Sequence, residues 1–165
     1  MYRRPFIRPL WDITEADWQD WSPNPRFAVF DAGTGTPTDD AVLDKETGLV
    51  WERSPAMDKK ASWNAAIVYS DTKVVGRRKG WRLPTIEELL SLVDPARSNP
   101  TLPAGHPFVN IQTDYFYWSC TLGMSNPPSD AWGYNFGNGD TSNVAKTAPV
   151  YVWLVRGGFG HDYPY

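Results

Sequence analysis

The chain has 165 residues with a formal net charge of −3 and a pI near 5.3. This size suits a single domain with one core. An acidic chain lacks the basic face that phosphate binding requires, which excludes nucleic acid as a partner, and the one basic run, Arg77-Arg78-Lys79, is expected to be a solvated loop. No apolar run approaches the ~20 residues of a membrane span.

Residues 1–24 are expected to form an aromatic arm that precedes the domain. Trp11, Trp18 and Trp21 lie in a polar, acidic segment, and exposing three such rings would be costly. We therefore expect the arm to dock on the body of the domain, or else on a neighbouring subunit. The stretch Met1–Trp11 has two arginines but no apolar segment behind them, so it is not a signal peptide. Either the protein is not exported by that route, or a leader has been removed.

The first regular elements are expected to be three strands. Phe27–Phe30 is a short apolar run that is followed by a turn-rich segment. Ala41–Asp44 and Leu49–Trp51 flank Lys45–Gly48, a connection that ends in glycine. This arrangement predicts a β-hairpin.

Two helices are expected next. Ser62 is placed to begin the first, with Trp63, Ala66 and Ile67 on its inner face. The second is the best-specified local structure of the chain, because a threonine and a glutamate three residues apart form a capping box before an apolar stripe that a proline ends. Its residues are Thr85 and Glu88 for the box, Ile86, Leu89, Leu90 and Val93 for the stripe, and Pro95 for the stop.

The second half of the chain is expected to alternate strands with irregular segments. The proline-rich segment 95–114 predicts an ordered loop. The strands expected after it are Tyr115–Thr121, Ala131–Phe136 and Val150–Val155, and the segments between them are Leu122–Asp130 and Gly137–Pro149. Val150–Val155 is apolar on both faces, which favours a central strand. A hairpin and two helices followed by loops and further strands indicate the α+β class.

The residue types that usually carry catalysis are sparse. Cys120 is the only cysteine, so no intrachain disulfide can form, and a buried inert thiol is its expected state. His106 and His161 lie in loops with no recognisable relation to it. No nucleophile elbow, phosphate loop, metal-binding spacing or pair of carboxylates in an apolar setting is present. We therefore do not expect an enzyme.

Several segments together resemble a known family, the C-terminal domain family of bacterial collagen-like adhesins (the Lcl C-terminal domain). In the first half they are Asp44–Glu52, Trp63–Ala66 and Gly80–Leu89. In the second half they are Pro107-Phe108, Tyr117–Ser119, Ala131-Trp132, Asn135-Phe136 with Gly139, and Val152–Gly158. The resemblance runs in order from about Arg26 to Gly158. It implies a C-type-lectin-like fold over residues 25–158, with two helices packed on a small, mostly antiparallel sheet, long irregular loops, and a tail at 159–165.

The resemblance also implies an extracellular or cell-surface setting, with one departure. Many relatives carry a cysteine at the end of the first helix and another in the last strand. The corresponding positions here are Ser70 (or Tyr69) and Leu154, so both halves of that bridge are missing. This weakens the implication of an oxidising compartment for this chain.

Calcium-dependent lectins of this fold use Glu-Pro-Asn or Gln-Pro-Asp followed by Asn-Asp, and none of these is present. The segment from Asn138 to Asn143, which includes Asp140, offers several oxygens but lacks the closing glutamate of a calcium loop. We therefore expect no cofactor and no metal, and take the segment as a surface turn. Calcium binding is left as an open alternative, although no full ligand motif supports it.

Sugar binding without calcium needs an aromatic platform beside amide or carboxylate groups. Trp132 and Tyr134 alternate along one expected strand face, although Trp132 could simply be core. The candidate ligand-binding residues lie in or beside the two irregular segments, which we expect to form one variable surface at one pole. They are Asn126, Asp130, Trp132, Tyr134, Asn135, Asn138, Asp140 and Asn143.

The sequence thus favours a non-catalytic binding or adhesion module that recognises glycan or protein on a cell or particle surface. The alternative is a structural subunit of a bacterial surface filament or phage particle that forms homo-oligomers through residues 1–24. A third possibility is a receptor-binding protein with diversified loops.

Overall fold

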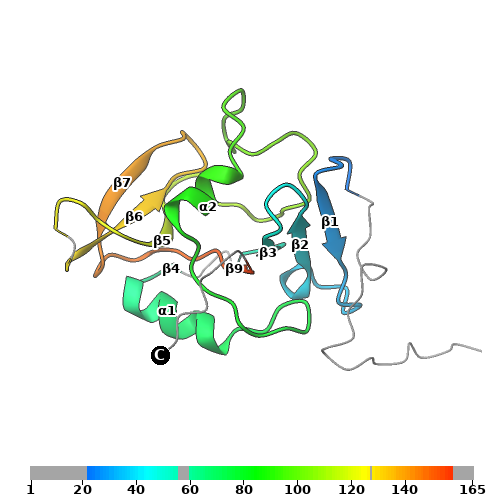
Figure 1. Ribbon diagram of the computed structural model, residues 1–165, viewed down its shortest axis with the longest axis horizontal. Helices are drawn as coiled ribbons and strands as arrows, with labels where there is room; N and C mark the ends of the chain where they lie inside the picture. The colour runs from blue at the N-terminus through cyan, green and yellow to red at the C-terminus, as the bar shows by residue number, and fades with distance from the viewer. Residues whose placement is uncertain (1–21, 56–59, 127, 158–165) are drawn as a thin grey trace, which may run out of the picture.

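The computed structural model of the protein describes residues 22–55, 60–126 and 128–157 (Figure 1). Trp11, Trp18, Trp21 and His161, with nearly all of the expected arm and the whole expected tail, lie outside the described residues. Two β-sheets and two helices make up the described part, which is an α+β fold. The sheets have four and five strands and so are larger than the single small sheet that we expected.

The first sheet, sheet A, has the strand order β1-β2-β3-β9 and is antiparallel throughout. Its strands are β1 (Phe27–Phe30), β2 (Ala41–Asp44), β3 (Val50–Glu52) and β9 (Val155–Arg156). A short 3-10 helix, η2 (Pro37–Asp39), precedes β2. The strand at 27–30 and the following hairpin are confirmed.

The second sheet, sheet B, has the strand order β4-β8-β5-β6-β7. Its strands are β4 (Lys60–Ala61), β8 (Val150–Tyr151), β5 (Tyr117–Leu122), β6 (Asp130–Tyr134) and β7 (Thr141–Ala145). Only β5 and β8 run parallel, and the other pairs are antiparallel.

The two expected helices are confirmed as α1 (Trp63–Thr72) and α2 (Ile86–Ser91). The capping box of α2 forms: Thr85 Oγ1 accepts from Glu88 N–H at 3.2 Å, and Glu88 Oε2 accepts from Thr85 N–H at 2.8 Å. At the start of α1, by contrast, the Ser62 side chain makes no capping hydrogen bond.

Sheet B is packed on both faces. One face, with Tyr117 and Tyr134, joins sheet A and α2 in a core that includes Trp51. The other face, with Trp118, packs in a second core together with Ala66 of α1. The rings therefore fill the interior on both sides of sheet B.

Two expectations about the last third of the chain are wrong. Val150–Val155 is not one strand: β8 pairs in sheet B, β9 pairs in sheet A, and Val152–Leu154 passes between them. The segment Gly137–Pro149 is not wholly irregular, because β7 lies within it and extends sheet B. Ser70 and Leu154, which stand at the expected half-cystine positions, are both buried.

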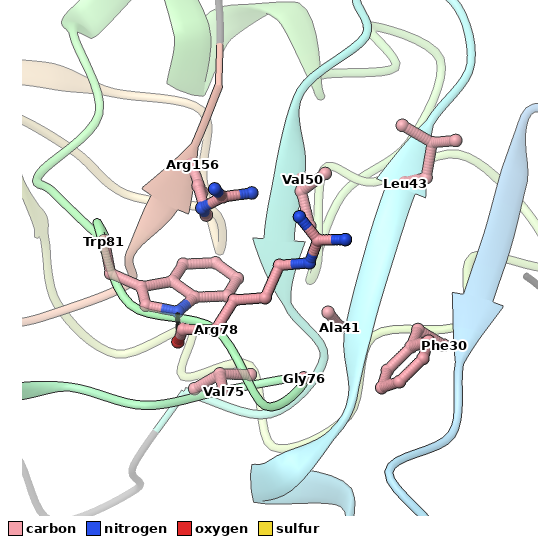
Figure 2. Close-up of a pocket in the computed structure, with 9 residues that line it drawn as sticks. All are labelled: Phe30, Ala41, Leu43, Val50, Val75, Gly76, Arg78, Trp81 and Arg156. Carbon is pink, nitrogen blue, oxygen red and sulfur yellow. Dashed lines mark hydrogen bonds between the residues drawn. The ribbon is translucent and has the colours of Figure 1, made fainter. Parts of the chain in front are cut away.

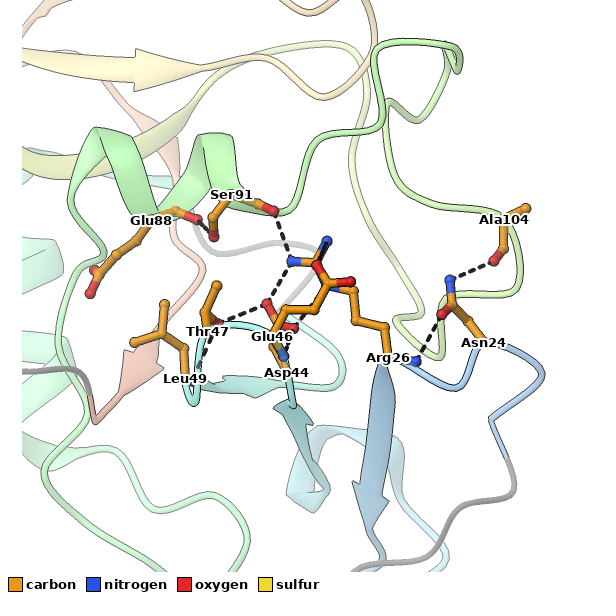
Figure 3. Close-up of polar contacts among 9 residues, drawn as sticks. All are labelled: Asn24, Arg26, Asp44, Glu46, Thr47, Leu49, Glu88, Ser91 and Ala104. Carbon is orange, nitrogen blue, oxygen red and sulfur yellow. Dashed lines mark hydrogen bonds and ion pairs between the residues drawn. The ribbon is translucent and has the colours of Figure 1, made fainter.

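The Asp44–Gly48 motif is a structural turn (Figure 3). The Asp44 carboxylate, fully buried, accepts two hydrogen bonds from Arg26 at 2.8 and 2.6 Å and one from the Thr47 hydroxyl. Arg26 also donates to the Ser91 carbonyl oxygen at 2.8 Å. One ion pair thus joins β1, the β2–β3 turn and the end of α2.

Candidate functional site

Most of the predicted ligand-binding residues lie on the β6–β7 hairpin, at the edge of sheet B. The two strands are antiparallel, with Trp132 opposite Asn143 and Tyr134 opposite Thr141. An antiparallel return places the β5–β6 loop at one end of the hairpin and the β6–β7 turn at the other (Figure 1). The expectation that both irregular segments meet at one pole therefore holds only in part. The turn that begins at Gly137 lies at the far end of the hairpin, whereas the later part of Gly137–Pro149 lies beside Leu122–Asp130, where Lys146 N–H donates to Ser129 carbonyl oxygen at 2.8 Å.

The first end of the hairpin brings together an aromatic ring and polar side chains. Asp130 and Trp132 are two residues apart on β6 and so share a face, and Asn143 lies across from Trp132 on β7. All three are partly exposed, and Asn126 in the adjoining loop is exposed. We call these four residues the Trp132 surface.

Backbone hydrogen bonds hold the loop beside this surface in place. Asn126 carbonyl oxygen accepts from Ser129 N–H and Asp130 N–H at 2.9 and 2.8 Å, and Gly123 N–H donates to Asp130 carbonyl oxygen. Asn143 Oδ1 accepts from Met124 N–H at 3.0 Å. A Cβ at position 123 would lie 2.6 Å from Asn143 Oδ1, so the loop can approach β7 this closely only with glycine there.

Two polar groups of the Trp132 surface stay available to a ligand. The Asp130 carboxylate and the Asn143 amide nitrogen make no hydrogen bond within the described part of the chain. Met124 in the same loop is 81 % exposed, an apolar neighbour that the sequence reasoning did not single out. The sequence feature that could have identified it is a large apolar side chain within the loop sequence Gly-Met-Ser-Asn-Pro.

At the other end of the hairpin, Asn135, Asn138 and Asp140 mainly bond to their own turn. Asn135 Oδ1 accepts from Gly137 N–H, Asn138 Oδ1 accepts from Asp140 N–H, and Asn138 Nδ2 donates to Asp140 Oδ2. These interactions are those of an Asx-type turn. The hydrogen bonds engage three of the four side-chain oxygens of these residues, so fewer acceptors remain for a ligand.

Tyr134 does not belong to an exposed platform. Its side chain is in the core with 1 % exposure, its ring contacts Phe136 edge-on, and its hydroxyl lies 3.1 Å from Thr101 Oγ1. It shares a face with Trp132, but this face continues under α2 and sheet A. Only Trp132, nearer the end of the hairpin, reaches solvent.

The remaining reactive groups are dispersed. Burial raises the pKa of the Cys120 thiol, which disfavours a thiolate nucleophile. His106 stacks on the Phe108 ring, and burial lowers its pKa. Across residues 22–55, 60–126 and 128–157, no three histidine, cysteine or acidic side chains gather as metal ligands.

The chain belongs to the Lcl C-terminal domain family, because residues 40–156 match the model of that family. The matched region covers the β2–β3 hairpin, both helices and all of sheet B, including the Trp132 surface. No curated protein matches the sequence. Within the described ranges, no helix is long and apolar enough to cross a membrane.

Proposed function

We propose that this Lcl C-terminal domain is a non-catalytic binding module that recognises glycan at a cell or particle surface through the Trp132 surface. The observation that supports the proposal most is the partly exposed Trp132 ring between Asp130 and Asn143, whose free polar groups flank it. A sugar can lay a CH face on an indole ring while its hydroxyls pair with a carboxylate and an amide. The module would serve adhesion outside the cell, and the fold would be C-type-lectin-like, as the family resemblance implies.

The proposed recognition does not use calcium. Calcium binding requires six to eight oxygen ligands held in place. Asp130 is the one acidic residue of the Trp132 surface, and Asn143 Oδ1 is already engaged by the Met124 amide. Chelation is therefore expected to leave binding unchanged.

A glycan array with calcium and with a chelator tests the proposal, followed by titration of the strongest sugar. Trp132→Ala and Asn143→Ala are each expected to weaken binding at least about tenfold, which corresponds to ~1.4 kcal/mol. Asn138→Ala is the matched control, because it removes an amide at the other end of the same hairpin. Thermal melts establish that each variant is folded.

Flat signals for every sugar class would contradict the proposal. So would a folded Trp132→Ala variant that binds as tightly as the unmodified protein. Binding that is lost with the chelator would contradict the calcium-independent form of the proposal.

A second candidate is assembly into homo-oligomers through residues 1–24. It is favoured by the three tryptophans of this segment, Trp11, Trp18 and Trp21, whose exposure to solvent would be costly. The residues that lead into β1 are anchored on the domain within the chain: Ser22 Oγ donates to Gly105 carbonyl oxygen at 3.3 Å, and Asn24 Nδ2 donates to Ala104 carbonyl oxygen at 2.9 Å. Deleting residues 1–21 keeps this anchor. Size-exclusion chromatography of the truncated chain is expected to show loss of oligomers with an unchanged melt, and an unchanged elution volume would refute assembly through this segment.

A further inference from the structure

A pocket of about 210 Å³ lies on sheet A, on the face that points away from the Trp51 core (Figure 2). Apolar side chains of β1, β2 and β3 form its floor, and the segment 75–81 forms a wall. The apolar lining residues are Phe30, Ala41, Leu43, Val50, Val75 and Trp81. Arg78 and Arg156 complete the lining, and Figure 2 shows both guanidinium groups beside the Trp81 ring and Val50.

A tight turn positions Arg78. Val75 and Arg78 exchange two backbone hydrogen bonds, at 3.1 and 2.9 Å, around Gly76 and Arg77. Both central residues have positive φ, 57° and 59°, as in the type I′ turn. Gly76 also allows the turn to approach sheet A, since a Cβ there would lie 3.1 Å from the Ala41 Cβ. The run Arg77-Arg78-Lys79 lies between the two helices with Arg77 and Lys79 exposed, as we expected of a solvated loop, but the tight turn holds Arg78 partly buried at the pocket.

Arg156 is held by its strand and by one side-chain bond. It lies opposite Val50 in the β3–β9 pair, and its Nε donates to the Lys79 carbonyl oxygen at 2.9 Å. Burial lowers the pKa of Arg156, and the nearby positive charge of Arg78 lowers it further. Two like charges therefore face the same small volume.

Neither of these arginines has a carboxylate partner in the described part of the chain. Arg26, Arg53 and Arg82, by contrast, each pair with a carboxylate at 2.6 to 2.8 Å. The chain has 19 carboxylate side chains and 16 lysines and arginines, so carboxylates are the more numerous charged groups. Two adjacent guanidinium groups that lack such a partner at an apolar pocket therefore favour the binding of an external anion.

We propose that this pocket binds a small organic acid whose carboxylate sits between Arg78 and Arg156 and whose apolar ring or branched chain fills the floor. The guanidinium groups supply a planar set of N–H donors that matches a carboxylate. The floor supplies apolar surface that a bare inorganic anion leaves uncovered. The volume admits one ring and is too small for an oligosaccharide, so this site is separate from the glycan surface proposed above.

The test is a titration of the ¹⁵N-labelled full chain with sodium cyclohexanecarboxylate, followed by NMR. The Trp81 indole N–H, which donates to the Arg78 carbonyl oxygen, reports from the pocket wall, and the Gly76 and Gly80 amides report from the turn. We expect saturable shifts of these signals with the acid. The neutral cyclohexanecarboxamide and sodium sulfate are each expected to bind at least about tenfold more weakly. The amide lacks the charge that pairs with the two arginines, and sulfate lacks the apolar ring that fills the floor.

Three variants of equal charge change complete the test. Arg78→Gln and Arg156→Gln are each expected to weaken acid binding at least about tenfold. Arg97→Gln is the control, since Arg97 is exposed and lies outside the pocket lining. Equal binding of sulfate or of the amide, an absence of saturable shifts in the unmodified protein, or equal weakening by Arg97→Gln would each overturn the proposal.

Discussion

The buried Glu52–Lys73 ion pair makes the sharpest prediction about stability. The Glu52 side chain is 1 % exposed, its Oε1 lies 3.2 Å from Lys73 Nζ, and its Oε2 accepts from Leu154 N–H at 2.8 Å. The pair joins the end of α1 to β3 and to the crossing segment before β9. We predict that Lys73→Met leaves a buried carboxylate without its counter-charge and strongly destabilises the fold at neutral pH.

The expected loss at pH 8 is about 3–5 kcal/mol of unfolding free energy, the usual cost of removing one partner of a buried pair. Its pH dependence follows from the direction of the pKa shift. Burial raises the pKa of Glu52 above its ordinary 4.5, an effect that Lys73 and the Leu154 N–H only partly oppose. Without Lys73 the pKa of Glu52 rises further, so the loss is full above the folded-state pKa of Glu52 in the variant. It shrinks by up to about 1.4 kcal/mol per pH unit as the pH falls from there toward the lower folded-state pKa of Glu52 in the unmodified protein.

Urea unfolding at pH 5, 6, 7 and 8, followed by tryptophan fluorescence, measures this loss. Lys79→Met is the matched control, because Lys79 is exposed and its side chain makes no interaction within the described residues; about 0–1 kcal/mol is expected. Glu52→Gln in the Lys73→Met background should remove the pH dependence, because a neutral amide can still accept from Leu154 N–H. A loss at pH 8 below about 1 kcal/mol, or an equal loss at pH 5 and pH 8, would refute the reasoning.

Three further predictions concern stability. Thr85→Ala should cost about 1 kcal/mol by urea unfolding, and Ser62→Ala only a few tenths, because only Thr85 makes a capping hydrogen bond; equal losses would contradict this. Gly137→Ala should lower the melting temperature far more than Gly35→Ala: the first new Cβ would lie 2.0 Å from a backbone oxygen, whereas the second meets no atom within 4 Å and adds only the strain of a positive φ. Stability should also fall above about pH 10, because burial raises the pKa of Tyr117, and its phenol ionises more readily in the unfolded chain than in the folded one. Spectrophotometric titration showing Tyr117 ionising at its ordinary pH in the folded protein would contradict the last of these.

Local patterns predicted the elements whose structure is decided locally. The capping box and apolar stripe of α2 depend on residues within one or two turns, so the sequence contains the whole instruction. The β2–β3 hairpin is similar, because Gly48 with φ of 72° closes a turn already held by the Asp44 carboxylate.

The errors arise where pairing between distant strands decides the structure. Val150–Val155 is apolar on both faces because it runs between two packed cores, and that pattern alone cannot distinguish one central strand from a crossing between two sheets. β7 was missed because its residues, Thr141-Ser142-Asn143-Val144-Ala145, show little apolar alternation. An edge strand with one solvated face needs few apolar residues of its own, because its backbone pairs with the neighbouring strand β6.

The candidate site shows the same limit. Alternation correctly placed Trp132 and Tyr134 on one face, but burial along that face depends on α2 and sheet A, which cover Tyr134 and leave Trp132 partly exposed. The separation of the two hairpin ends follows from β7, so missing that strand also produced the expectation of a single pole. The arginine pocket forms where β9 meets the turn at 75–78. These segments are distant in the sequence, since the hydrogen-bonded residues Lys79 and Arg156 are 77 positions apart, and a local pattern therefore could not predict the pocket.

Two of the segments that carry the family resemblance build the scaffold. Asp44 of the turn motif pairs with Arg26, and Arg82 before α2 pairs with Glu88 through two hydrogen bonds at 2.7 and 2.6 Å. Both ion pairs engage their charged groups within the protein, whereas the Asp130 carboxylate and the Asn143 amide nitrogen make no hydrogen bond within the described residues.

The two proposed sites can be tested independently because they share no residue and lie on different sheets. The Trp132 surface belongs to the β6–β7 edge of sheet B, and the arginine pocket lies on sheet A, lined by strands β1, β2, β3 and β9 and by the segment 75–81. Substitutions at separate sites without common partners usually have additive effects. Trp132→Ala should therefore leave the binding of an organic acid unchanged, and Arg78→Gln should leave glycan binding unchanged. If either substitution affects both ligands while the fold is intact, the two sites are coupled through sheet B and sheet A, and neither can be assigned its ligand on local chemistry alone.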